Sequence, residues 1–436
     1  MKKKVALHNL GCKVNAYELE AMQEMLEKAG YEIVPFAPGA DVYIINTCTV
    51  TNIADRKSRQ MLHKARKMNP EAIVIAAGCY VQAQKNMENI DDAIDIVLGN
   101  NRKQDLLFVL ENYKKGSGQE KDLISLDKPV EYEELQLSST GEHTRAYLKV
   151  QDGCNQFCSY CIIPYVRGRV RSRRKEEVLE EVLRLTKNGY QEFVLTGIHL
   201  SSYGVDCEDN LLELIKAVHE IEGVKRIRLG SLEPRIITEE FAQALGNMPK
   251  ICPHFHLSLQ SGCDATLMRM NRKYSAEEYL EGCRLLRKYF KNPALTTDVI
   301  VGFPQESEEE FEQSYKMIES VEFYETHIFK YSRRQGTKAA AMEGQITEAV
   351  KAARSEKMLE LNRQRSLEYE ESMIGKNLEI LLEEEVELQG KAYYLGHSRE
   401  YVKVAVEKTE SLKVNDLLTV KITGFTEEHI LGGELV

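Results

Sequence analysis

Three cysteines near the middle of the 436-residue chain are spaced closely enough to bind a metal cluster. Cys154, Cys158 and Cys161 have the spacing C-x3-C-x2-C, at the start of the stretch 151–175. Thiolates are the usual ligands of iron–sulfur clusters, and three of them can hold three corners of a four-iron cluster. The fourth iron then has no protein ligand, so we expect it to bind a small molecule.

Two other kinds of metal site fit this spacing less well. A structural zinc site normally has four protein ligands, and the nearest histidine, His143, stands alone before an expected strand. A ferredoxin-type electron-transfer cluster uses four cysteines. Three ligands therefore favour a cluster with one open iron.

A second set of three cysteines follows apolar runs in the first part of the chain. Cys12, Cys48 and Cys79 each come just after an expected strand, where open α/β sheets build their binding crevice. A single such cysteine is more often a buried structural thiol, but three at matching strand ends predict a second iron–sulfur cluster. The other cysteines have no ligand spacing and are expected to be buried or incidental: Cys207, Cys252, Cys263 and Cys283.

The elements that would position these cysteines alternate between strands and helices. In residues 1–113, short strands are expected at 5–10, 32–36, 42–46, 73–77 and 96–98, and helices at 16–29, 53–68 and 81–89. This alternation predicts a parallel sheet covered by helices. Residues 114–143 are polar and aperiodic, which predicts a linker with one short strand near 123–126.

A strand–helix unit then repeats six times within residues 144–371, which predicts a partial (βα)6 barrel. The expected strands are 146–150, 192–195, 226–229, 254–259, 294–301 and 325–331, and the expected helices include 175–188, 211–221, 238–245, 276–289 and 307–320. The Cys154–Cys161 loop follows the first strand, at the face where such barrels carry their active sites.

The pattern of short apolar runs and glycine-containing turns in residues 372–436 predicts a small β-barrel. Its strands are expected at 378–382, 393–395, 401–405 and 418–423. Such barrels often bind nucleic acid, but residues 368–436 hold seven Lys and Arg against fifteen Asp and Glu, which weakens that inference. A charged helix over 343–365 is expected to pack this module onto the central barrel.

Composition limits the class of protein further. The chain has a net charge of −10 and ten cysteines, too few for a disulfide scaffold. No apolar run approaches the length of a membrane-spanning helix, and the basic start of the chain does not resemble a signal peptide. We therefore expect a cytoplasmic protein with no membrane partner.

A basic arm follows the central cysteines and holds six cations in nine residues. A charge run of this kind is usually a solvated face, but this one borders the expected cluster. We predict that it contacts RNA phosphates through Arg167, Arg169, Arg171, Arg173 and Arg174.

The central motif, after the first strand of a partial barrel, resembles the radical S-adenosylmethionine (SAM) superfamily. The resemblance implies that SAM chelates the open iron and is cleaved to a 5′-deoxyadenosyl radical. It also implies that cofactor-binding residues lie at the barrel strand ends, namely Thr196, Gly197, Glu233, Arg235, Gln260 and Asp298, beside Cys154, Cys158 and Cys161.

Nearly the whole chain resembles the radical SAM methylthiotransferases, which have an N-terminal α/β domain, a radical SAM barrel and a C-terminal TRAM β-barrel. The resemblance implies two 4Fe-4S clusters, one on Cys12, Cys48 and Cys79 and the other on Cys154, Cys158 and Cys161. The run Gly11-Cys12-Lys13-Val14-Asn15, with the central cysteine run, resembles the MtaB-type branch. That branch converts N6-threonylcarbamoyladenosine, beside the tRNA anticodon at position 37, to its 2-methylthio form.

The implied reaction uses two SAM molecules: one supplies a methyl group, and the other yields the radical that removes hydrogen from C2 of adenine. A tRNA substrate and a reductant such as flavodoxin or ferredoxin are the implied partners. Other branches act on isopentenyladenosine in tRNA or on an aspartate of a ribosomal protein. The competing hypothesis from another class is a non-catalytic electron carrier with two clusters and an RNA-binding module.

Overall fold

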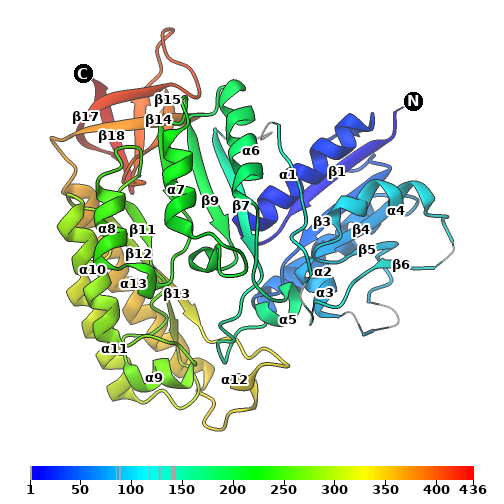
Figure 1. Ribbon diagram of the computed structural model, residues 1–436, viewed down its shortest axis with the longest axis horizontal. Helices are drawn as coiled ribbons and strands as arrows, with labels where there is room; N and C mark the ends of the chain where they lie inside the picture. Colours follow the sequence, from blue (N-terminus) through cyan, green and yellow to red (C-terminus); the bar gives the residue numbers. More distant parts are fainter. Residues whose placement is uncertain are drawn as a thin grey trace.

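The computed structural model describes residues 2–436 except 85, 88, 89, 117, 127, 129 and 139–143. His143, considered above as a metal ligand, lies outside the described residues. Three units follow one another along the chain: an N-terminal α/β domain, a central βα barrel and a C-terminal β-barrel (Figure 1). The predicted fold class, α/β with a partial βα barrel and a small β-barrel, is confirmed.

The N-terminal domain contains a six-stranded parallel sheet in the order β2-β1-β3-β4-β5-β6. Successive residues of a strand face opposite sides, so its apolar runs supply a core to both faces of the sheet. Helices α2 and α3 cover one face, and α1 and α4 cover the other. The strands are β1 (Lys4–Asn9), β2 (Glu32–Ile33), β3 (Val42–Thr47), β4 (Ile73–Gly78), β5 (Ile96–Leu98) and β6 (Glu120–Asp122). The helices are α1 (Lys13–Lys28), α2 (Asn52–Met68), α3 (Cys79–Ala83) and α4 (Leu106–Asn112), with a 3-10 turn η1 (Lys103–Asp105).

Two predictions for this region were wrong in position. The helix expected over 81–89 is α3, which begins at Cys79 itself and ends at Ala83; residues 85, 88 and 89 lie outside the described part. The strand expected near 123–126 is β6, which ends at Asp122 and extends the sheet as its edge.

The segment predicted as a linker packs between the N-terminal domain and the βα barrel. Leu135 and Leu137 are buried against Tyr17 of α1. The hydroxyl of Tyr17 donates to the carbonyl of Leu135 at 2.6 Å, and that of Tyr132 donates to the carbonyl of Lys149 at 2.7 Å. The described part of residues 114–143 therefore forms part of an interface and is not a free connection.

The βα barrel is open, as predicted. One sheet has the order β10-β9-β7-β8 and the other β11-β12-β13, and isolated parallel bridges such as Ile227–Ile251 join them. The strands are β7 (Arg145–Asp152), β8 (Arg171–Ser172), β9 (Glu192–Gly197), β10 (Arg226–Leu229), β11 (His254–His256), β12 (Ala294–Val301) and β13 (Glu325–Lys330). The helices are α5 (Ile163–Arg167), α6 (Lys175–Lys187), α7 (Leu211–Glu220), α8 (Glu239–Gly246), α9 (Asp264–Arg269), α10 (Ala276–Tyr289), α11 (Glu308–Val321), α12 (Lys338–Ala341) and α13 (Glu348–Glu371), with 3-10 turns η2 (Leu200–Ser202) and η3 (Pro234–Ile236).

The C-terminal barrel closes in the order β14-β15-β16-β18-β17. Its strands are β14 (Asn377–Leu388), β15 (Lys391–Ser398), β16 (Lys403–Glu407), β17 (Leu417–Glu427) and β18 (Ile430–Leu435). The fifth strand, β18, was not predicted, because Gly432 and Gly433 lie in its middle and glycine is rare in strands.

Charged side chains dock this barrel onto the amino-terminal ends of the central strands. Arg226 at the start of β10 pairs with Glu379 at 2.9 Å, and Arg145 at the start of β7 pairs with Glu383 at 3.3 Å. The charged helix predicted over 343–365 is α13, and its last turn meets the C-terminal barrel through Glu370 and His429, 2.9 Å apart. The C-terminal barrel therefore lies at the end opposite the Cys154–Cys161 loop (Figure 1).

No helix in the described part of the chain has both the length and the apolar character needed to cross a membrane.

Candidate iron–sulfur and substrate site

The three N-terminal cysteines lie together at the carboxyl edge of the parallel sheet. Cys12 caps α1, Cys48 follows β3, and Cys79 is the first residue of α3. The loops touch, because a Cβ atom added to Gly11 would lie 3.2 Å from Cβ of Cys48. Gly11 (φ +117°) and Gly78 (φ +93°) adopt backbone conformations that favour glycine, which explains their place just before two of the cysteines.

The surroundings of these thiols fit an anionic cluster. Arg167 donates from Nε to Sγ of Cys79 at 3.3 Å, and Asn100 donates from Nδ2 to the same sulfur at 3.5 Å. The amino-terminal, partly positive end of α1 lies at Cys12. Burial raises the pKa of the Cys48 thiol to about 11, so a thiolate here needs a metal to replace its proton. These residues could hold an iron–sulfur cluster.

The second cysteine set lies at the carboxyl-terminal end of the barrel strands, in the loop after β7. The loop is held by backbone bonds, from the amide of Cys161 to the carbonyl of Cys158 and from the amide of Cys154 to the carbonyl of Gly168, both at 3.0 Å. Arg272 donates from Nη1 to Sγ of Cys158 at 3.2 Å. Each cysteine set therefore has an arginine that donates a hydrogen bond to sulfur, which fits a negatively charged cluster.

The predicted SAM-contacting residues lie around the barrel mouth and interior. Glu233 and Arg235 pair with each other at 2.9 Å beyond the end of β10. Gln260 has a left-handed backbone conformation (φ +69°), and its backbone N–H donates to the carbonyl of Asp298 at 2.8 Å. Thr196 and Gly197 end β9. The contacts of all six residues with a cofactor stay a prediction.

A cavity of about 620 Å³ extends along the barrel interior and has walls from all three units. Cys12 and Lys13 come from the N-terminal domain, and Tyr401 comes from the C-terminal barrel. The βα barrel supplies the remaining polar wall, which includes Thr196, Gly197, Ser231, His254, His256, Thr296, Asp298, Glu325 and His327. The cavity therefore extends from a cysteine of the first set to the carboxyl ends of the barrel strands.

The walls of this cavity include several charged and polar side chains among apolar ones. Nε2 of His256 lies 3.2 Å from Oδ2 of Asp298, and the ring of His256 stacks on that of His327 with centroids 5.6 Å apart. Lys13 lies in the wall of the cavity and forms no ion pair with any residue that the structure describes. Burial and the cations of Arg228 and Arg145 lower the pKa of Lys13 to about 8, so it stays largely protonated at neutral pH.

The basic arm after the central cysteines lies mostly inside the protein. Arg167, Arg171 and Arg173 are 0, 3 and 1% exposed. Arg167 pairs with Asp152 at 3.2 Å, Arg171 lies 3.5 Å from the same carboxylate, and Arg173 hydrogen-bonds to the hydroxyl of Tyr17 at 3.4 Å. The prediction that these three arginines contact RNA is wrong, because their side chains are buried in ion pairs and hydrogen bonds. Those of Arg167 and Arg173 reach the N-terminal domain, and those of Arg171 stay within the βα barrel. Arg169 and Arg174 are exposed, and their contact with RNA stays a prediction.

Glu18 of α1 is the centre of this buried network. Its carboxylate lies 2.8 Å from Arg167, 2.9 Å from Lys149 and 3.3 Å from Lys103. Although burial acts in the opposite direction, these cations hold the pKa of Glu18 well below its ordinary value. The network fixes α1, and with it Cys12, against the first strand of the barrel.

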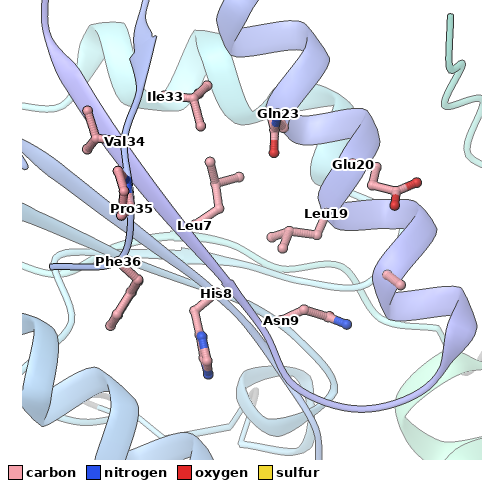
Figure 2. A pocket seen from close by; sticks show the side chains of 11 residues that line it. Leu7, His8, Asn9, Leu19, Glu20, Gln23, Ile33, Val34, Pro35 and Phe36 are labelled. Carbon is pink, nitrogen blue, oxygen red and sulfur yellow. The ribbon is translucent and has the colours of Figure 1, made fainter. Parts of the chain in front are cut away.

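A second cavity, of about 630 Å³, lies on the N-terminal domain between α1 and the segment after β2. Figure 2 shows Leu7 and His8 of β1 facing it, with Leu19 and Gln23 of α1 on one side and Phe36 on the other. None of its eleven lining residues was predicted as a site residue, and none is a cysteine. Of these two cavities, the one that includes Cys12 is therefore the one next to a candidate cluster cysteine.

Comparisons with known proteins agree with this geometry. Residues 148–318 match the radical SAM superfamily, and residues 4–99 match the uncharacterized protein family UPF0004. The chain is 41% identical over 421 residues to a Bacillus subtilis (strain 168) protein named threonylcarbamoyladenosine tRNA methylthiotransferase MtaB, and the match covers 96% of this chain and 93% of the relative. An Aquifex aeolicus protein of the same name is 39% identical, covering 89% and 95%.

More distant matches extend the comparison. A Thermoanaerobacter protein (strain X514) named tRNA-2-methylthio-N(6)-dimethylallyladenosine synthase is 36% identical and covers 99% of this chain and 92% of its own. Among solved structures, the radical SAM methyltransferase TsrM of Kitasatospora setae superposes with a TM-score of 0.55 at 15% identity, over 78% of this chain and 77% of that one. This last likeness shows the fold alone.

The open barrel, with a cysteine triplet after its first strand, defines a radical SAM enzyme. The chain belongs to the MtaB family of radical SAM tRNA methylthiotransferases. The family resemblance seen in the sequence is thereby confirmed.

Sequence reasoning missed part of the site. Lys13 was noted only as part of a family run, and His256, His327 and Tyr401 were not considered. The order of the barrel strands could have indicated His256 and His327, since parallel neighbours β11, β12 and β13 place them beside Asp298. Tyr401 had no local signal, because only the docking of the C-terminal barrel brings it to the cavity.

Proposed function

We propose that this enzyme converts N6-threonylcarbamoyladenosine at position 37 of tRNA, next to the anticodon, to its 2-methylthio derivative. Relatives at 35–41% identity that carry this activity in their names support the choice of nucleoside. The proposal includes two 4Fe-4S clusters, on Cys12, Cys48 and Cys79 and on Cys154, Cys158 and Cys161, and two SAM molecules per turnover. It also includes a reductant of the flavodoxin or ferredoxin class and a cytoplasmic location.

The observation that carries this proposal is the set of charged and hydrogen-bonding groups, Lys13 among them, in the wall of the cavity that begins at Cys12. A threonylcarbamoyl group ends in a carboxylate and a hydroxyl, which need charged and hydrogen-bonding partners when they leave water. An isopentenyl group is apolar and would be favoured by an apolar wall. Lys13, the histidines and Asp298 therefore suit the threonylcarbamoyl group better.

In the overall reaction, the C2–H bond of adenine is replaced by a C2–S–CH3 group. One SAM supplies the methyl group and leaves as S-adenosylhomocysteine. The other leaves as methionine and 5′-deoxyadenosine, which carries the hydrogen removed from C2, and the reductant supplies the electrons. When bound, the clusters would supply the one-electron chemistry and the sulfur.

The residues of the chain orient and enclose these reactants. The strand ends of the barrel position SAM near Cys154, Cys158 and Cys161, and the network around Glu18 and Arg167 holds the Cys12 loop against the barrel. The C-terminal barrel closes the far end of the cavity with Tyr401. The adenine ring would thereby lie next to Cys12 and near the carboxyl ends of the barrel strands.

The test is reconstitution of the protein with iron and sulfide under anaerobic conditions, followed by SAM, dithionite and a tRNA that carries N6-threonylcarbamoyladenosine. We expect mass spectrometry of the nucleosides to detect the 2-methylthio product. Product formed only from isopentenyladenosine tRNA would overturn the choice of nucleoside. A protein that never forms 5′-deoxyadenosine would instead support the electron-carrier hypothesis.

A further inference from the structure

Helix α2 presents a row of exposed cations in a chain whose net charge is −10. Six of its seventeen residues are Lys or Arg, and one, Asp55, is acidic. Its buried side consists of Ser58, Leu62 and Ala65. The opposite side, called here the α2 cationic face, consists of Arg56, Lys57, Arg59, Lys64 and Lys67, all exposed and none in an ion pair with a described residue.

The helix is fixed to the loop that carries Cys48. The hydroxyl of Ser58 donates to the carbonyl of Cys48 at 3.0 Å and accepts from its amide at 3.2 Å. Thr49, the next residue, donates to the carboxylate of Asp55 at 2.6 Å. A ligand bound to the cationic face would therefore be held in a fixed position relative to the first cysteine set.

The start of α2 is also bonded to the βα barrel. Arg334, after β13, pairs with Asp55 at 2.8 Å and donates to Asn52 at 2.6 Å. Asn52 in turn donates to the carbonyl of Arg333 at 3.1 Å. The helix thus begins where the two domains meet, and it extends from there for about 25 Å at 1.5 Å per residue (Figure 1).

The other surfaces considered for RNA are less suitable. Three arginines of the basic arm are buried. The C-terminal barrel has an excess of acidic residues and docks at the amino-terminal ends of the strands, opposite the Cys154–Cys161 loop. Phosphates attract Lys and Arg wherever these are free of internal partners, and α2 offers five of them on a helix that is bonded to the Cys48 loop.

We propose that the α2 cationic face binds the phosphates of the tRNA anticodon stem while the modified adenine enters the cavity at Cys12. This inference rests on the proposed function, because it assumes a tRNA substrate. Contacts to phosphate fix the register of a nucleic acid and carry no sequence information. The face would therefore orient the stem, and the cavity would select the nucleoside.

The experiment compares full-length reconstituted protein with a variant carrying Arg56→Gln, Lys57→Gln, Arg59→Gln and Lys64→Gln. The matched control carries glutamine at four exposed lysines of the βα barrel: Lys187, Lys225, Lys291 and Lys316. The probe is an anticodon stem-loop RNA that contains N6-threonylcarbamoyladenosine, titrated at several salt concentrations. We expect the α2 variant to bind about tenfold or more weakly. Its log–log salt slope should fall by up to about 3.6, since each of four lost phosphate contacts contributes about 0.9.

The outcomes separate this inference from the proposed function. A wild-type protein that does not bind the RNA would overturn both. Wild-type binding with unchanged affinity and slope in the α2 variant, or an equal loss in the control, would overturn the role of α2 alone. A second measurement does not depend on variants: the bound RNA should protect Lys57, Lys64 and Lys67 from acetylation, whereas equal labelling with and without RNA would contradict the proposal.

Discussion

Nε of Arg167 lies 3.3 Å from Sγ of Cys79, although the two residues belong to different domains and are 88 positions apart. The same guanidinium pairs with Glu18 and Asp152, and all these groups are buried. Arg167 follows Cys161 by six residues, so one side chain connects the loops of both cysteine sets. Its role is to position the first set against the second.

Replacing Arg167 should therefore destabilise the protein before any cluster is bound. Arg167→Ala leaves the carboxylates of Glu18 and Asp152 without their shared partner in a buried site, which we expect to cost about 3–5 kcal/mol of unfolding free energy. Urea denaturation of the metal-free protein measures this. The exposed neighbour is the control, because Arg169→Ala should change the unfolding free energy by less than about 0.5 kcal/mol. Equal stability of the two variants would show that the buried network contributes nothing.

The two cysteine sets should load iron independently. A variant with Cys12, Cys48 and Cys79 all changed to alanine should retain about half of the iron after reconstitution and still cleave SAM to 5′-deoxyadenosine. The corresponding change at Cys154, Cys158 and Cys161 should retain a similar share of iron but lose SAM cleavage. Cys207→Ala is the control and should keep the full iron content. SAM cleavage by the second variant would refute the assignment of its cysteines.

Lys13 should recognise the carboxylate of the threonylcarbamoyl group. We expect Lys13→Gln to lower kcat/KM about 10- to 100-fold, because a hydrogen bond to a charged group contributes about 1.5–3 kcal/mol. The control is an RNA whose threonyl carboxylate is replaced by a carboxamide, on which wild type and variant should be equally slow. A similar loss on both RNAs would assign Lys13 a structural role instead.

The stability of the interface should fall as the pH rises from about 4.5 to 7. Burial and the neighbouring Glu177 carboxyl raise the pKa of Glu134 from 4.5 to about 7, against the opposing effect of Arg173. A carboxyl whose pKa is higher in the folded state binds its proton more tightly there, so its stabilising contribution is complete below pH 4.5 and lost above pH 7. Urea midpoints across this range should decline less in Glu134→Gln than in wild type. Parallel curves would contradict the raised pKa.

The fold and the six cysteines could be predicted because their signals are local. Apolar runs bounded by turns set the strands, and Cys12, Cys48 and Cys79 each follow the end of a strand within three residues. A motif of eight residues contains the other three cysteines. These features depend on neighbours in the sequence, and most of the expected strands and helices overlap those of the structure.

The charged parts of the site could not be predicted in this way. Arg167 looks like part of a solvated run, because its partner Glu18 lies 149 residues earlier on a helix whose charges seem suited to water. The α2 cationic face could not be predicted as a site for a different reason. Basic residues are common on surface helices, and only the structure shows that this helix is bonded to the Cys48 loop. Burial of a charge depends on tertiary contacts, and local spacing does not contain them.

The order in which the chain is synthesised determines when the cavity that includes Cys12 can be completed. One wall contains Lys13 and another contains Tyr401, so its two sides leave the ribosome almost at the beginning and the end of translation. Domains generally fold from the N-terminus as they are synthesised, so the central barrel can form while its interior is still open at one end. A cavity with walls from all three units then exists only once the C-terminal barrel has folded, and a truncated product keeps its cysteines without the complete wall.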